Sequence, residues 1–306
     1  MKIDTPVILI TFLRPDTTLR ILKIIKENNI QNLFIFNDGP RKNTKDIIQI
    51  KKVRNIIDNF SFNKKINKMY KEKNIGLKNN IPKALDWVFR KFDRAIILEC
   101  DCIPHKNFFR FCELLLKKYK NDLRISQISG TNLIHDNNFI RRNNDSYFFS
   151  KLTPCWGWAT WKDRWVNTYD LKMKSWPIVK KENWINDIFQ TKEKINYWKK
   201  IFNRRYKEID NDWDRIWTYA NLINNRISII PSKNLISNTG YDSFAAHKNP
   251  SKWKDLKIDK INFPLKHPII IHPDNSYDDF IMKAGFSNAK LTWRIKNKIK
   301  KILNIH

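Results

Sequence analysis

The chain has 306 residues, of which 42% are hydrophobic and 13% aromatic, so it can bury a large core and is not a disordered segment. Its formal net charge of +29 would suit a nucleic acid, an acidic substrate or an anionic membrane surface. Lys, Ile and Asn are abundant along the whole length, so the charge marks no single site. We therefore expect no specific nucleic-acid partner.

The cysteines and the first apolar run indicate the cellular compartment in which the protein is expected. Cys100 and Cys102 are too close for an ordinary disulfide, and none of the four cysteines forms a Cys-x-x-Cys pair typical of zinc sites. Reduced thiols and a cytoplasmic chain are therefore expected. The apolar run 7–13 is too short for a signal peptide or a membrane span.

Strands and helices are expected to alternate in the first half. Short apolar runs rich in branched side chains predict strands, and apolar residues at helical spacing predict helices between them. The helix after Pro15 is expected to be capped by Asp16 or Thr17. This alternation predicts a doubly wound, mostly parallel sheet. The expected strands are 7–12, 33–36, 68–70, 95–98 and 125–129.

The second half is less regular. A short strand is expected at 147–149, followed by Lys- and Trp-rich helical stretches to about residue 225 and a last strand at 227–231. No linker separates the two halves, so one domain over 1–250 is expected, followed by a C-terminal extension over 251–306.

The end of the chain predicts a basic amphipathic helix. Between residues 288 and 306, Leu291, Ile295, Ile299 and Ile302 recur at helical spacing among many lysines. Such a helix would lie on an anionic membrane surface or dock against the preceding domain. The pattern leaves both alternatives open.

An acidic pair closes the most apolar strand. Glu99 and Asp101 follow the run 95–98, and Pro104 prevents simple continuation of the strand. Ligands of open α/β sheets bind beyond the carboxyl ends of the strands, so this pair is expected to project into a site. Two such carboxylates can hold a divalent cation and leave positions for phosphate oxygens. A strand end without a ligand is the competing interpretation.

The sequence offers no glycine cradle for phosphate. Neither Gly-x-x-x-x-Gly-Lys nor, after the first strand, Gly-x-Gly-x-x-Gly is present. A phosphate-binding enzyme of this sequence would therefore neutralise its ligand with a metal and basic side chains.

Seven blocks, in order, resemble a bacterial family of GT-A-fold glycosyltransferases, which is itself similar to the N-acetylglucosaminyltransferases that begin N-glycan branching. The similarity runs from residue 6 to about residue 247. The blocks are 10–15, 37–41, 74–76, 96–104 with Phe108 and Phe109, 156–161, 213–217 and 234–240.

The resemblance implies both a fold and an activity. The fold would be GT-A, which is Rossmann-like with a mostly parallel central sheet flanked by helices, here with a helical, Trp-rich C-terminal half. The activity would be metal-dependent transfer, with inversion, of a hexosyl or N-acetylhexosaminyl group to a glycan or lipid-linked acceptor hydroxyl. A UDP-sugar donor, Mn²⁺ or Mg²⁺, and a role in surface polysaccharide biosynthesis, in the cytoplasm or on the inner face of the membrane, are expected with it.

For the donor, the resemblance implies roles for five residues. Phe12 and Arg14 match the segment that lines the nucleotide pocket, and Asp38 matches an acidic residue facing the base or ribose. Asn74 and Gly76 match a loop that approaches the nucleotide. Core packing for Phe12, and turn formation for the residues in the two loops, are the alternatives.

For the metal and the donor sugar, Asp101 matches the family's usual direct metal ligand and Glu99 matches the acidic residue that contacts the sugar or the hydrated metal. Cys100 stands where the family has a third acidic residue. His247 matches a late histidine that can reach the metal or the diphosphate. An ordinary loop histidine is the alternative.

For catalysis, Asp214 matches the general base that takes the proton from the acceptor hydroxyl, with Asp212 as the second candidate. A helix N-cap is the alternative for either residue. The block of Trp156, Gly157, Trp158 and Trp161 resembles the wall of an acceptor pocket, and a packed aromatic core is the alternative.

Two other functions compete. A sugar-nucleotide nucleotidyltransferase would need a Gly-rich basic loop after the first strand, which residues 12–15 lack. A basic nucleic-acid-binding protein would explain the charge but not the ordered blocks.

Overall fold

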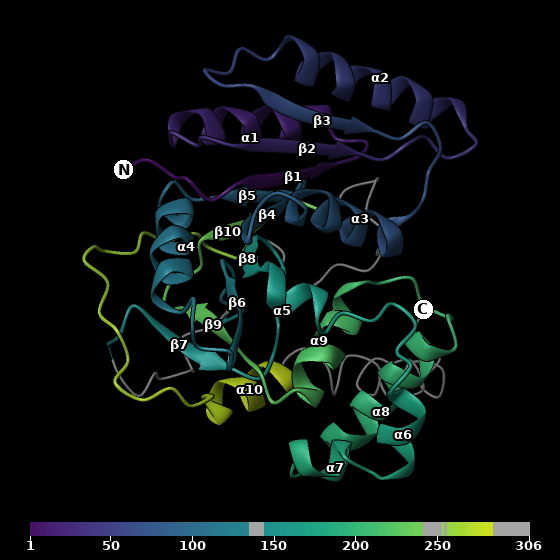
Figure 1. Ribbon diagram of the computed structural model, residues 1–306, viewed down its shortest axis with the longest axis vertical. Coiled ribbons are helices and arrows are strands. Elements are labelled where there is room, and N and C mark those ends of the chain that lie inside the picture. Colours follow the sequence, from purple (N-terminus) through teal and green to yellow (C-terminus); the bar gives the residue numbers. More distant parts are fainter. Residues whose placement is uncertain (135–143, 241–252, 254–255, 284–306) are drawn as a thin grey trace, which may run out of the picture.

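The computed structural model describes residues 1–134, 144–240, 253 and 256–283. His247 and the predicted helix of 288–306 lie outside these residues. The predicted fold class is confirmed: the chain is an α/β protein with a mostly parallel central sheet flanked by helices (Figure 1).

The predicted alternation in the first half is also confirmed. All five residues of β1 and of β2 are buried, as expected for parallel strands covered on both faces. The strands are β1 (Val7–Thr11), β2 (Leu33–Asn37), β3 (Ile66–Tyr70), β4 (Arg94–Glu99) and β6 (Ile125–Ser129), and the helices between them are α1 (Pro15–Glu27), α2 (Thr44–Asn59), α3 (Leu77–Phe89) and α4 (Asn107–Lys118).

The eight-stranded sheet has the order β3-β2-β1-β4-β8-β6-β9-β7. β8 (Trp158–Trp161) is inserted antiparallel between β4 and β6, and β7 (Tyr147–Ser150) is antiparallel to β9 (Ile227–Pro231). The other strands all run the same way as β1. The strand β8 was not predicted, because its tryptophan-rich sequence lies in a block that was interpreted as a pocket wall.

A second, two-stranded sheet holds the acidic segment. β5 (Cys102–Pro104) pairs antiparallel with β10 (Ile236–Asn238), and Pro104 is its last residue. The main-chain N–H of Thr239 then donates to the carbonyl oxygen of Asp101, 2.9 Å away. The residues between β4 and β5 are therefore held in place by the pairing of β5 with β10 and by this hydrogen bond.

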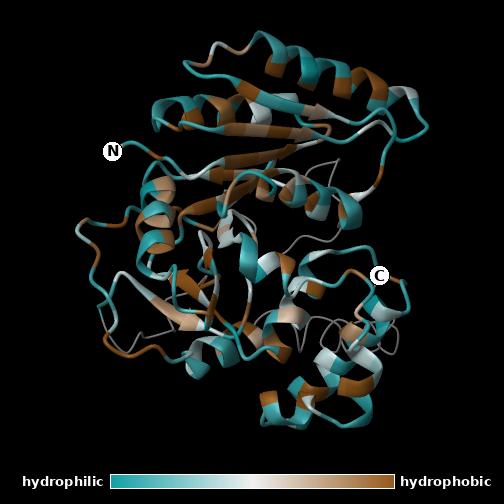
Figure 2. Cartoon of the chain, in the orientation of Figure 1, coloured by the Kyte–Doolittle hydropathy of each residue, from teal (hydrophilic) through white to brown (hydrophobic). Residues whose placement is uncertain are grey.

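The hydrophobic core lies on both faces of the large sheet, and Figure 2 shows its central strands in brown. A further aromatic cluster joins the helices of the second half, which confirms its predicted helical, Trp-rich character. The helices joined by this cluster are α6 (Trp176–Lys181), α7 (Ile185–Ile188), α8 (Lys192–Tyr206), α9 (Asp214–Ile223) and α10 (Asn275–Met282), while Trp165 of α5 (Lys162–Val166) packs in the core of the sheet.

The prediction for the start of the first helix was wrong. Pro15 occupies the first helical position after Arg14, and no side chain caps the helix. The fixed φ of proline suits this position, so Asp16 and Thr17 fall inside the first turn.

Buried side chains of the expected C-terminal extension, such as Tyr277 and Ile281 of α10, belong to the same aromatic cluster as Trp176 and Trp198. The boundary at residue 250 stays a prediction. Among the described residues, no helix is long and apolar enough to cross a membrane.

Candidate active site

The acidic segment lies at the carboxyl edge of the sheet, where β1 and β4 are neighbours. Glu99 is the last residue of β4 and pairs with Ile10 of β1. The chain that leaves β1 therefore passes beside the chain that leaves β4. This brings Arg14 to Asp101, with Nη1 of the guanidinium 3.5 Å from Oδ2 of the carboxylate.

Gly240 packs directly against the carboxylate of Asp101. A Cβ atom at this position would overlap Asp101 Oδ2 and lie 2.9 Å from Asn238 Oδ1. Only glycine lets the backbone come this close. The segment after β10 therefore fixes the orientation of the Asp101 side chain as well as its main chain.

Glu99, Asp101 and Asp214 line one cavity of about 190 Å³. The elements that meet there are the start of α3, the end of β4, the segment before β8, the start of α9 and the end of β10. The complete lining is Leu77, Glu99, Asp101, Cys155, Trp156, Asp212, Trp213, Asp214, Asn238 and Gly240.

The cavity is strongly acidic. Burial, followed by the charges of Asp101 and Asp214, raises the pKa of Glu99 well above its usual range, and Arg14 opposes this shift. Beside it, burial and the Asp101 charge raise the pKa of the Cys100 thiol to about 12. Cys100 is therefore a neutral thiol at physiological pH, and the raised pKa of Glu99 favours the protonated form of that carboxyl group as well.

The two candidate bases have different surroundings. Asp212 forms an ion pair with Arg205, whose side chain is buried. Asp214 is the first residue of α9 and 38% of its side chain is exposed, while the Nε of Arg215 lies 3.8 Å from its Oδ2. Trp213 occupies the N-cap position of α9 and no side chain caps the helix. The geometry thus leaves the Asp214 carboxylate more accessible to a substrate.

The donor set suits a hard divalent cation with few protein ligands. Within the described part of the chain, no cluster of three His, Cys, Asp or Glu side chains could hold a metal ion. Mg²⁺ and similar ions are commonly held by one or two carboxylates, with water and substrate phosphates completing the shell. Glu99 and Asp101 at an open cavity fit that mode of binding.

The Asp38 carboxylate joins two loops of the structure, and its contact with a base or ribose stays a prediction. The carboxylate is buried and accepts hydrogen bonds from the main-chain N–H groups of Gly39, Ile75 and Gly76, at 2.8, 3.0 and 3.2 Å. The side chain of Asn74 also donates to it. These bonds join the two loops that follow β2 and β3, and none of these residues lines the cavity. Their arrangement positions Leu77, which does line it.

Phe12 lies at the end of β1 and is half-buried. Its ring is 5.4 Å from the guanidinium carbon of Arg41, a cation–π distance. It does not line the cavity.

The tryptophan block divides between core and cavity. Trp158 and Trp161 are buried, because β8 lies inside the sheet and the two side chains pack in separate core clusters, Trp158 with Trp213 and Trp217 and Trp161 with the helix side that includes Leu116. The indole of Trp158 stacks on Trp213 at 5.4 Å, and Gly157 packs against Ile236. Of the block, Trp156 alone lines the cavity. Core packing accounts for the other three residues.

Sequence reasoning missed several lining residues. Asn238 and Gly240 belong to a block that was noticed but given no role, although its Gly could have indicated a close approach of backbone. Arg215, which directly follows the candidate base, was given no role either, and it lies outside the lining of this cavity. Leu77 and Cys155 carry no signal in the sequence, because their position depends on which strands pair.

No protein-family model and no curated protein matches the chain. Among solved structures, it is similar to the mannosyltransferase PcManGT from Pyrobaculum calidifontis in complex with GDP-Man and Mn²⁺, with 10% identity and a TM-score of 0.33, over 52% of this chain and 45% of that one. HddC from Yersinia pseudotuberculosis has 14% identity and a TM-score of 0.26, over 40% and 56%.

A 4-diphosphocytidyl-2C-methyl-D-erythritol synthase from Anaerococcus prevotii has 12% identity and a TM-score of 0.31, over 73% of this chain and 99% of that one. The chain spans about half the length of the first two structures. Likenesses this distant assign no activity or donor to this protein.

Proposed function

We propose that this protein is a glycosyltransferase that moves a sugar from a nucleoside-diphosphate donor to an acceptor hydroxyl. One observation supports the proposal most strongly. Asp101 at the end of the central strand and Asp214 at the start of α9 line the same cavity with Glu99. A site of this kind has carboxylates at one end for a metal-bound diphosphate and a further carboxylate for a proton.

Each residue has a separate role in the proposed transfer reaction. The Asp214 carboxylate accepts the proton of the acceptor hydroxyl while that oxygen bonds to the anomeric carbon. The bond between that carbon and the diphosphate oxygen breaks in the same displacement, and the nucleoside diphosphate leaves with the electron pair. Because one displacement occurs, the anomeric configuration inverts.

Arg14 assists the leaving group from beside Asp101, outside the lining of the cavity. Its guanidinium lies against Asp101, where it can form charge-assisted hydrogen bonds to diphosphate oxygens. A Mn²⁺ or Mg²⁺ ion held by Asp101 and Glu99 would supply further neutralisation of the leaving group. Asp212 serves a supporting role, since its charge is balanced by Arg205.

Product analysis tests the proposal against the nucleotidyltransferase alternative. The full chain is incubated with Mn²⁺ and a panel of nucleoside-diphosphate sugars, and separately with nucleoside triphosphates and sugar 1-phosphates. Slow release of nucleoside diphosphate and free sugar from one donor supports the proposal. Release of pyrophosphate from a triphosphate, with no donor hydrolysis, would overturn it in favour of the alternative.

A further inference from the structure

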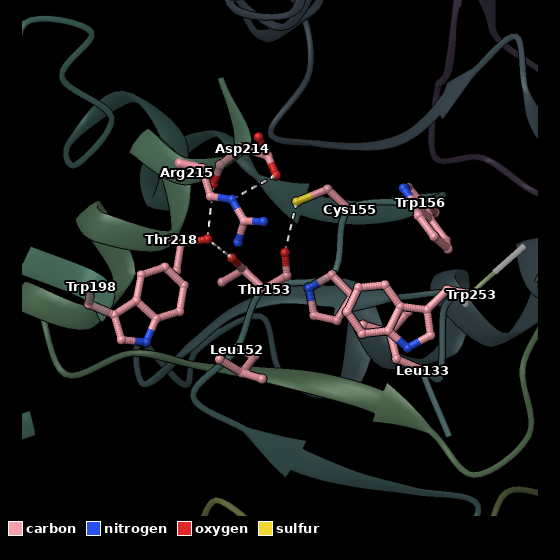
Figure 3. Close-up of a pocket in the computed structure, with 11 residues that line it drawn as sticks. Leu133, Leu152, Thr153, Cys155, Trp156, Trp198, Asp214, Arg215, Thr218 and Trp253 are labelled. Atoms are coloured by element: carbon pink, nitrogen blue, oxygen red, sulfur yellow. Dashed lines mark hydrogen bonds and ion pairs between the residues drawn. The ribbon is translucent and has the colours of Figure 1, made fainter. Parts of the chain in front are cut away.

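A second cavity lies next to the first on the far side of Asp214. It encloses about 120 Å³ and shares Cys155, Trp156 and Asp214 with the first cavity (Figure 3). A hydroxyl held at Asp214 would therefore lie at the boundary, with the rest of its molecule free to extend into the second space. The remaining lining residues are Leu133, Leu152, Thr153, Pro154, Trp198, Arg215, Thr218 and Trp253.

Three tryptophans contribute to this lining. Trp156 and Trp253 are half-buried and lie on one side of the cavity, while the fully buried Trp198 closes the opposite side (Figure 3). Indole rings offer large rigid apolar faces with one polar edge. Such faces suit the apolar face of a pyranose ring.

Arg215 brings a positive charge to the cavity, and because its Nε lies 3.8 Å from Oδ2 of Asp214 the two charges partly balance. Arg215 borders the second cavity and not the first, and its guanidinium carbon lies 5.9 Å from the ring centre of Trp198. Burial works against the charge of this side chain, but Asp214 and Tyr197 raise its pKa above the ordinary value. Among the described residues of the lining, Asp214 at the boundary is the single acidic one.

A planar guanidinium in a partly dry cavity favours planar anionic groups, because it can form two parallel hydrogen bonds to a carboxylate or phosphate. The half-buried position of Arg215 makes such a pair stronger than it would be on the surface.

We propose that the second cavity binds the acceptor, and that Arg215 selects an acceptor sugar carrying an anionic substituent. The assignment as an acceptor site rests on the proposed function. The anionic group is a carboxylate or a phosphate on the pyranose ring, and the two sources are separated by the probes below.

The test measures binding of single sugars without any donor. Methyl β-D-glucuronide, glucose 6-phosphate and methyl β-D-glucoside are titrated against the full chain by ligand-observed NMR. At least one anionic sugar is expected to bind about tenfold or more tightly than the glucoside, which corresponds to about 1.4 kcal/mol. The better of the two anionic probes identifies the substituent.

Two variants separate the cavity from the general basic charge of the protein. Arg215→Gln is expected to abolish the preference for anionic sugars. Arg124→Gln removes the same charge from an exposed site and is expected to leave the preference unchanged. If circular dichroism shows that Arg215→Gln does not fold, Arg215→Lys decides, with an expected loss of about threefold or more because lysine cannot make the paired hydrogen bonds.

Equal binding of all three sugars, no binding of any, a preference that survives the Arg215 variant, or equal loss in Arg124→Gln would overturn the proposal. These failures differ from a failure of the proposed function. A protein that prefers anionic sugars but hydrolyses no donor would refute the proposed transferase activity and leave the proposed anion-binding site supported. A protein that hydrolyses a donor but does not prefer anionic sugars would refute the anion-binding site alone.

Discussion

The guanidinium of Arg14 lies against the carboxylate of Asp101, with 3.5 Å between Nη1 and Oδ2. Parallel pairing of β1 with β4 creates this contact between residues far apart in the sequence. The positive charge opposes binding of a free cation at Asp101 and favours binding of a nucleoside diphosphate, which is negative. The two effects should therefore separate experimentally.

We expect Arg14→Gln to weaken binding of a nucleoside diphosphate by about tenfold, because one charge-assisted contact is lost. Binding of Mn²⁺ in the absence of nucleotide is expected to be unchanged or tighter. Isothermal titration calorimetry with each ligand measures both, and Arg20→Gln on the exposed side of α1 is the matched control. Unchanged nucleotide affinity in Arg14→Gln would contradict its proposed role.

Substitution at Asp214 should affect chemistry more than binding. Asp214→Asn removes the proton acceptor, so kcat for transfer is expected to fall about 10²–10⁴-fold while nucleotide affinity is retained. In Asp212→Asn the buried Arg205 loses one of its two carboxylate partners and keeps Asp210, 3.4 Å away, so the main expected effect is a lower melting temperature. The reverse pattern, with Asp212→Asn inactive and Asp214→Asn active, would transfer the role of base to Asp212.

Gly240 should be intolerant of a side chain for a local reason. In Gly240→Ala the new Cβ would displace the Asp101 carboxylate, so cation and donor affinity are expected to fall about tenfold or more with little change in melting temperature. Gly76→Ala is the matched control, in which stability and not affinity is expected to change. Its φ of 75° disfavours any side chain, but no atom lies near the new Cβ, so a loss of about 1 kcal/mol of stability without loss of affinity is expected. Wild-type donor affinity in Gly240→Ala would refute this account of the close packing.

Asp278 should make stability depend on pH. Burial raises the pKa of its carboxyl group to about 6, while Ser150 and the main-chain N–H of Lys151 donate hydrogen bonds to it. The folded state therefore binds more protons than the unfolded state between about pH 4 and pH 6. This contribution to stability is fully present below about pH 4 and is lost as the pH rises through about 6.

Asp278→Asn removes that titration. Its unfolding free energy relative to wild type should therefore increase by about 2 kcal/mol between pH 4 and pH 7. Thermal or denaturant unfolding at several pH values measures the difference in unfolding free energy between the two proteins. The contributions of the other titrating groups are the same in both proteins and cancel in this difference. Parallel pH profiles for the two proteins would show that the Asp278 carboxyl titrates normally.

The sequence was sufficient for the parts of the fold that depend on local patterns. The runs 7–10 and 33–36 are uniformly apolar because both faces of a parallel strand are covered, and this pattern is visible without a structure. The acidic residues at the end of β4 could also be placed at the carboxyl edge of the sheet, because the apolar run before them marks the strand. These predictions required no knowledge of distant contacts.

The candidate site was harder to predict because it depends on pairing between distant segments. Insertion of β8 between β4 and β6 buries Trp158 and Trp161 and leaves Trp156 at the cavity, a distinction that three similar residues in one block do not reveal. Likewise, the sequence indicates only a turn residue that could bind a ligand at Asp38. In the structure its carboxylate accepts hydrogen bonds from main-chain N–H groups of the loop after the next strand. The ion pair of Asp212 with Arg205 is also a tertiary feature.

The most direct test of the account is Mn²⁺-dependent hydrolysis of the preferred nucleoside-diphosphate sugar by the wild-type chain and by Asp101→Asn. The asparagine keeps the shape of the side chain but lacks the negative charge. We predict that the wild-type protein releases nucleoside diphosphate only when a divalent cation is added, and that Asp101→Asn, although folded, releases about 10² to 10³-fold less at any Mn²⁺ concentration. Equal hydrolysis by the two proteins would contradict the central role of Asp101.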